Sequence, residues 1–192
     1  MKQSICIFWD SIVHWFFDKE WWWANRIKSN LEEQSDFVYV LGIPWDTTQT
    51  LLLRLDNECS VREPDKIILS IWINDTIFLR DSGSNLVPID EFRTNIKKLI
   101  DITKSFTDDI VFLTIGNVDE KRVTPMPWEE NMEYRNGNIV AYNSALKSIL
   151  DWSGIRYVDI YWIMEESDLS DWIHPNSLGH FKIYDRILHE II

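Results

Sequence analysis

Glycine is scarce in this chain. Only 6 of the 192 residues are Gly, about 3% against a usual ~7%, whereas 11 are Trp. Tight turns between strands and helices use Gly because it alone adopts positive φ angles without a steric penalty. An ordinary enzyme of this length needs more Gly than the sequence contains, so the positions of the Trp residues require attention.

Cysteine and long hydrophobic runs are also in short supply. The two cysteines, Cys6 and Cys59, have no spacing typical of a disulfide framework or a metal site, and we expect buried, reduced thiols. No stretch reaches the ~18 apolar residues of a membrane span. The first ten residues, MKQSICIFWD, contain one Lys and too short an apolar run for a signal peptide, which predicts a cytoplasmic protein.

Positive charge is the third deficit. The chain has 19 Lys and Arg against 31 Asp and Glu, a net charge of −12 and a pI near 4.7, and its basic residues are scattered. Nucleic acids and anionic membrane surfaces bind clustered positive charge. We therefore expect neither as a partner.

The chain does contain a regular alternation of apolar runs and helical patterns. At 45% apolar residues, residues 1–192 can form a single domain with a full core. Buried strands are predicted at 4–8, 36–41, 66–71, 109–115 and 155–160, and helices at about 20–34, 46–59, 89–106, 138–152 and 176–190. Strict alternation predicts an α/β fold with a parallel sheet covered on both faces.

Capping residues support several of these boundaries. Asp46-Thr47, Asp90 and Asn176 precede helical patterns as N-caps do, and Gly154 follows the fourth helix as a C-terminal Gly does. The irregular stretch 116–138 is too long for a simple connection, so we interpret it as a functional loop.

Polar residues follow four of the predicted strands or precede the last helix. They are Asp10-Ser11, GIPWDTT (42–48), WIND (72–75) and SDWIHPN (170–176). Ligands of open parallel sheets bind beyond the carboxyl ends of the strands, where these segments meet. Together they supply a hydroxyl, an imidazole, carboxylates and an amide, which are the parts needed for acyl transfer.

In order, the four segments resemble the four blocks of the SGNH hydrolases, or GDSL-type esterases, from Phe8 to Gly179. The resemblance implies a three-layer, flavodoxin-like α/β/α sandwich with five parallel strands in the order 2-1-3-4-5. It implies Ser11 as nucleophile, His174 as general base and acid, and Asp171 as the carboxylate that orients His174. It further implies an oxyanion hole formed by the backbone N–H groups of Ser11 and Trp45 and by the Asn74 amide, with Asp10 and Asp75 as supporting residues. No metal or cofactor is implied.

The departures from the family pattern are all of one kind. Trp stands where the family has Gly in each block, at Trp9, Trp45, Trp72 and Trp172, and Trp15 and two of residues 21–23 also occupy turn-like positions. Replacing seven of them by Gly would restore glycine to about 7%. One interpretation is a UGA codon that means glycine in the host but is translated here as Trp. The other is a natural Trp-rich variant.

Several functions are compatible with these residues. The first is a serine esterase acting on a small ester, and the second is a carbohydrate O-deacetylase using the same residues. If the Trp residues are genuine, Trp45 and Trp72 would crowd the oxyanion hole, which favours a non-catalytic binding domain. Metal-dependent phosphoester hydrolysis by Asp10, Asp75, Asp171 and His174 predicts inhibition by chelators. Acyl length, alcohol and oligomeric state stay open.

Overall fold

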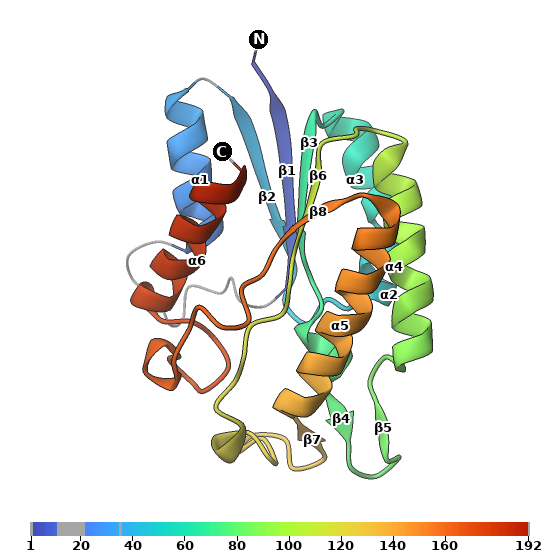
Figure 1. The fold of residues 1–192 in the computed structure, drawn as a ribbon, viewed down its shortest axis with the longest axis vertical. Helices are drawn as coiled ribbons and strands as arrows, with labels where there is room; N and C mark the ends of the chain where they lie inside the picture. Colours follow the sequence, from blue (N-terminus) through green and yellow to red (C-terminus); the bar gives the residue numbers. More distant parts are fainter. Residues whose placement is uncertain (1, 11–21, 35, 192) are drawn as a thin grey trace.

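The computed structural model describes residues 2–10, 22–34 and 36–191. Its centre is a five-stranded sheet in the order β2-β1-β3-β6-β8, in which every neighbouring pair is parallel (Figure 1). The strands are β1 (Ser4–Trp9), β2 (Phe37–Gly42), β3 (Lys66–Ser70), β6 (Ile110–Leu113) and β8 (Arg156–Val158). Counted along the chain these are strands 2-1-3-4-5, so the expected sheet and strand order are confirmed.

Burial explains why continuous apolar runs form the middle of this sheet. Every residue of β3 and β6 is buried, as is all of β1 after its first residue. The edge strand β2 instead begins with alternating exposed and buried residues. Strands covered on both faces need no polar face, whereas an edge strand retains one.

Helices cover both faces of the sheet. In Figure 1, α1 and α6 lie on one side and the remaining helices on the other. The helices are α1 (Trp23–Glu33), α2 (Thr48–Leu52), α3 (Leu55–Arg62), α4 (Ile89–Lys104), α5 (Asn136–Ser153) and α6 (Ser177–Ile191), with short 3₁₀ turns η2 (Ile73–Thr76), η3 (Glu120–Arg122) and η4 (Glu166–Asp168).

The single helix expected over 46–59 is wrong, because the segment forms α2 and α3. Arg54 interrupts it with non-helical backbone, φ −122° and ψ −21°. Its guanidinium reaches back to the Asp46 carboxylate and to the carbonyl of Leu41, where β2 is ending. The break therefore coincides with an Arg that ties the start of α2 to the sheet.

Most of the expected caps are confirmed. Thr47 caps α2 with a reciprocal capping box, the Asn176 side chain accepts two backbone N–H groups at the start of α6, and Gly154 ends α5 at φ 66°. Asp90 is not an N-cap, because Pro88 holds that position and Asp90 lies in the first turn of α4. Its carboxylate there still interacts favourably with the helix dipole.

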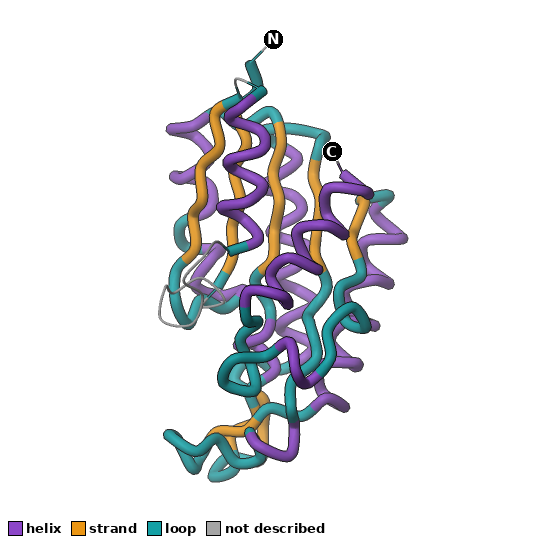
Figure 2. The backbone as a smooth tube through the Cα atoms, turned by 90° about the vertical axis from the view of Figure 1, so that its left-hand side faces the viewer, coloured by secondary structure: helices purple, strands orange, loops and turns teal. Residues whose placement is uncertain are grey.

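A second, small sheet lies beyond the carboxyl ends of the main strands (Figures 1 and 2). Its antiparallel strands β4 (Phe78–Leu79), β5 (Ser84–Asn85) and β7 (Met132–Glu133) run in the order β5-β4-β7. This sheet is absent from the sequence-based expectations, because two-residue strands carry no measurable periodicity. It fastens part of the stretch 116–138 to the segment after β3.

Two sequence expectations concern buried sulfur and membrane spans. Cys6 and Cys59 are both buried and unbridged, and burial is the main cause that raises the pKa of each thiol to about 12. Within the described residues, no helix combines the length and hydrophobicity needed to cross a bilayer.

Candidate active site

The segments singled out in the sequence converge at the carboxyl edge of the main sheet. Ser11, the expected nucleophile, lies outside the described residues, as do Trp15 and Trp21, so the position of Ser11 does not enter the site geometry. The preceding residue, Asp10, is buried at the end of β1, and its Oδ2 accepts the backbone N–H of Trp72 at 3.3 Å. Asp10 thereby joins the chain after β1 to the chain after β3.

His174 and Asp171 form a close pair on the loop between η4 and α6. His174 Nδ1 lies 2.7 Å from Asp171 Oδ2. The other carboxylate oxygen accepts the backbone N–H groups of His174 at 2.8 Å and Ile173 at 3.2 Å. An ionised carboxylate can only accept, so the imidazole hydrogen belongs on Nδ1 and the lone pair on Nε2.

Electrostatics keep Asp171 ionised. Burial, the largest single influence, acts to raise the pKa of Asp171, but the hydrogen bond and positive charge of His174 and the two backbone N–H groups together lower it below its usual value. The charged carboxylate is therefore the stable form beside the imidazole at neutral pH.

The loop that carries this pair is folded on itself. The backbone N–H of Ser170 donates to the His174 carbonyl at 2.7 Å, and Leu169 and Pro175 form an isolated antiparallel bridge. At the base of the loop, the buried Asp168 carboxylate pairs with Lys182 of α6 at 2.6 Å. The pair is thus presented on a short loop that is anchored to the last helix.

Asn74 lies in η2 with a side chain that is almost fully buried. Its Nδ2 donates to the Asp46 carbonyl at 2.9 Å, and its Oδ1 lies 3.0 Å from the hydroxyl of Tyr134. A backbone carbonyl only accepts, so the contact with Asp46 fixes which end of the amide is nitrogen.

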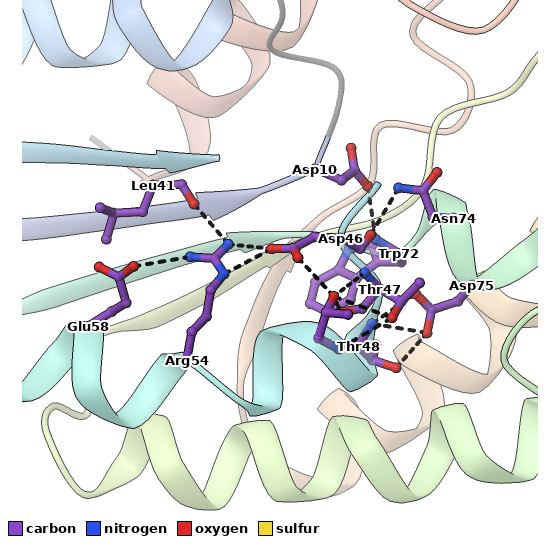
Figure 3. A network of polar contacts seen from close by, with 11 residues as sticks. Asp10, Leu41, Asp46, Thr47, Thr48, Arg54, Glu58, Trp72, Asn74 and Asp75 are labelled. Carbon is purple, nitrogen blue, oxygen red and sulfur yellow. Dashed lines mark hydrogen bonds and ion pairs between the residues drawn. The ribbon is translucent and has the colours of Figure 1, made fainter. Parts of the chain in front are cut away.

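Asp75, in the segment after β3, contacts Thr48 at the start of α2, after β2 (Figure 3). Its carboxyl group accepts the backbone N–H of Thr48 at 3.0 Å and the Thr48 hydroxyl at 2.5 Å, and Asn95 of α4 donates to that hydroxyl. Burial, helped by the negative charge of Asp10 and opposed by the Thr48 hydrogen bonds, raises the pKa of Asp75 to about 7. Asp75 is therefore a structural clamp between the loops after β2 and β3.

Three of the four Trp residues of the motif blocks fall into two groups by backbone angle. Trp45 and Trp172 have φ angles of 65° and 73°, the left-handed region that favours Gly. Trp72 has φ −166°, which any residue adopts, and its indole is buried, stacks on Phe112 and donates to the Leu113 carbonyl. The backbone argument for Gly thus holds at positions 45 and 172 and not at 72.

The Trp residues also differ in how deeply they are buried. Trp45, which the sequence places at a tight turn, is 54% exposed, so its indole has room at the surface. Trp9 is 1% exposed and lies against Gly42, where a Cβ would be only 1.8 Å from the indole nitrogen. That nitrogen has no hydrogen-bond partner within the part of the chain that the structure describes.

Two residues at the site were missed by sequence reasoning. Tyr134 contacts Asn74 and lies within the stretch interpreted as a functional loop, but nothing in the local pattern marks it out. Arg54 lies in a helical pattern and reads as a solvated charge, whereas its side chain is largely buried against Asp46. Across residues 2–10, 22–34 and 36–191, no three His, Cys, Asp or Glu side chains are grouped to hold a metal ion.

Comparisons with known proteins agree on the fold. The model of the GDSL-like lipase/acylhydrolase family matches residues 9–181. One similar solved structure is LAE5, an α/β hydrolase from the metagenome of Lake Arreo, Spain, with 20% identity and a TM-score of 0.76 over 97% of this chain and 94% of that one. A second is the acetylxylan esterase Axe2 of Geobacillus stearothermophilus in a catalytic mutant form, with 18% identity and a TM-score of 0.75 over 98% of this chain and 94% of that one. A third is a lipase/acylhydrolase from Enterococcus faecalis, with 21% identity and a TM-score of 0.76 over 100% of this chain and 95% of that one. No curated protein matches the chain.

Proposed function

Since the chain belongs to the GDSL-like lipase/acylhydrolase family, we propose that it hydrolyses a small carboxylic ester through an acyl-enzyme on Ser11. The observation that carries the proposal is the hydrogen-bonded pair of Asp171 and His174, at the edge of the sheet where β1 ends, two residues before Ser11 in the sequence. No metal or cofactor is needed for this chemistry.

The proposed first step is acylation. His174 Nε2 takes the proton of the Ser11 hydroxyl as its oxygen attacks the ester carbonyl, and Asp171 holds the imidazole in the required tautomer and stabilises the imidazolium. Collapse of the tetrahedral intermediate expels the alcohol, which receives the proton from His174. Water, activated by the same imidazole, then attacks the acyl-enzyme and releases the acid.

The negative charge on the intermediate's oxygen needs donors that are already in place. We assign the Asn74 side-chain amide and the backbone N–H groups of Ser11 and Trp45 to this oxyanion hole. The support is that Asn74 is buried with its amide orientation fixed by the Asp46 carbonyl. Donors that are fixed before the reaction stabilise developing charge without reorganisation. Asp10 and Asp75 support the loops and do not react.

The direct test is labelling. A serine-directed fluorophosphonate should attach to Ser11, and peptide mass spectrometry locates the adduct. Wild-type protein should hydrolyse short aryl esters such as p-nitrophenyl acetate, and Ser11→Ala should abolish both hydrolysis and labelling. Labelling at another residue, or activity that survives Ser11→Ala, contradicts the assignment, and an inactive, unlabelled wild type favours a non-catalytic binding domain.

Acetylated carbohydrate is the second candidate substrate class. One similar structure is an acetylxylan esterase, and two partly or largely exposed indoles, Trp45 and Trp172, lie on the loops of the proposed site. Acetate release from acetylated xylo-oligosaccharides, compared with p-nitrophenyl acetate at equal concentration, separates the two. A much higher kcat/KM for the sugar identifies a carbohydrate O-deacetylase.

A further inference from the structure

Among the described residues, Tyr134 places its hydroxyl on the Asn74 amide. Its ring is 3% exposed, and its hydroxyl lies 3.0 Å from Asn74 Oδ1. Because the Asp46 carbonyl occupies the nitrogen end of the amide, the oxygen end must accept from Tyr134. The two contacts therefore hold the amide from both ends.

The tyrosine hydroxyl keeps its proton in this position. Burial, and then the negative charges of Asp10 and Asp171, raise the pKa of Tyr134 far above its ordinary value. A hydroxyl that stays protonated next to carboxylates remains a donor throughout the pH range in which an esterase works. Deprotonation of Tyr134 therefore does not remove this donor from the Asn74 amide at neutral pH.

The small sheet fixes the two residues relative to one another. β7 ends one residue before Tyr134 and pairs with β4, which begins shortly after η2, with Phe78 opposite Glu133. Arg135 lies over the Phe78 ring at 3.6 Å and forms an ion pair with Glu133. Asn74, just before β4, and Tyr134, just after β7, therefore lie beside the same end of two paired strands.

We infer that Tyr134 is a positioning residue that, braced by the β4–β7 pair, holds the Asn74 amide so that its second Nδ2 hydrogen points at the oxyanion. The inference rests on the proposed function, because it concerns an oxyanion donor. It gives the stretch 116–138 a role in the reaction through Asn74, without contact with the substrate.

The test compares Tyr134→Phe with Tyr142→Phe. Both remove one buried hydroxyl, but the Tyr142 hydroxyl donates to the backbone carbonyl of Val87 and not to the Asn74 amide. Tyr134→Phe should lower kcat about three- to tenfold with KM little changed, as expected when a single positioning hydrogen bond is lost. Tyr142→Phe should leave kcat close to the wild-type value at a comparable loss of melting temperature.

A double-mutant cycle decides whether Tyr134 acts through Asn74. In an Asn74→Ala background, Tyr134→Phe should cause no further loss of kcat. An equal loss in both backgrounds, equal losses from the two Tyr→Phe changes, or an unchanged Tyr134→Phe enzyme would overturn the inference while leaving the ester hydrolase intact. Absence of Ser11-dependent hydrolysis in the wild type would instead overturn the proposed function, and the inference with it.

Discussion

The Asp171–His174 pair and the Asn74 amide lie at the same edge of the sheet but are held in opposite ways. The pair is local: its members are three residues apart, and the hydrogen bonds that join them lie within one loop. Asn74 is held by residues 28 and 60 positions away along the chain. The proposed base and its carboxylate can therefore form from a short segment, whereas the proposed oxyanion donor depends on contacts between distant parts of the chain.

The largest expected effect is at the local pair. Asp171→Asn should lower kcat about 10³–10⁴-fold, because an amide in place of the carboxylate stabilises the wrong tautomer of His174 and does not stabilise the imidazolium. Steady-state kinetics with an aryl ester measures it. Asp185→Asn, an exposed carboxylate on α6, is the matched control and should retain wild-type rates. Equal rates for Asp171→Asn and wild type would remove Asp171 from the mechanism.

The next largest effect is expected at Asn74, which distant parts of the chain hold in place. Asn74→Ala should lower kcat about 10²–10³-fold and change KM much less, because it removes a donor that acts in the transition state. It should also cost ~1–3 kcal/mol of stability, since the Tyr134 hydroxyl and the Asp46 carbonyl lose a buried partner. Urea denaturation measures the second quantity. A change confined to KM would mean that Asn74 only shapes the pocket.

This contrast also explains what the sequence could predict. The five strands and the Asp171-x-x-His174 pair follow from short-range patterns, because buried strands are continuous apolar runs and a three-residue spacing fits one turn, whereas the strand order came from the family resemblance. Tyr134 and the β5-β4-β7 sheet could not be predicted. Their strands are two residues long, and the contact between Tyr134 and Asn74 depends on a pairing register that no local pattern specifies.

Asp75, beside Asn74, and Asp171, in the local pair, should also contribute to stability with opposite dependence on pH. The raised pKa of Asp75, about 7 against an unfolded value near 4, means that the folded state holds an extra proton between those values. This contribution is complete below about pH 4 and is lost as pH rises toward 7. The lowered pKa of Asp171 has the opposite sign, so its contribution is present above about pH 4 and is lost in acid.

Urea denaturation across pH 4 to 8 tests this difference. In the wild type, the Asp75 contribution makes the free energy of unfolding fall between pH 4 and 7, and Asp75→Asn should remove that component of the slope. Asp159→Asn is the control, since Asp159 has a lowered pKa and pairs with Lys147. If Asp75→Asn has the same pH dependence as wild type, Asp75 is ionised throughout and the clamp to Thr48 is between a charge and a hydroxyl.

The smallest effects are expected at the left-handed Trp residues. Trp45→Gly and Trp172→Gly should each stabilise the protein by up to about 1 kcal/mol, because a non-Gly residue at φ near 70° costs ~1–2 kcal/mol and the greater unfolded entropy of Gly offsets part of the gain. Trp72→Gly, at an extended backbone position, should instead destabilise the chain by about 3–5 kcal/mol through lost packing on Phe112.

These three variants separate the two explanations of the Trp excess. A chain whose Trp residues are all its own should have adapted to each, so that removal of Trp45 or Trp172 is neutral or unfavourable. Gains at 45 and 172 favour misread glycines there, and the decisive measurement is the mass of the protein from its native host. Misread codons at positions 9, 45, 72 and 172 make that mass lower by several Gly-to-Trp differences. A native mass that matches the Trp sequence makes the largely exposed Trp45 and the partly buried Trp172 genuine residues of this chain, to be tested as walls of the substrate pocket.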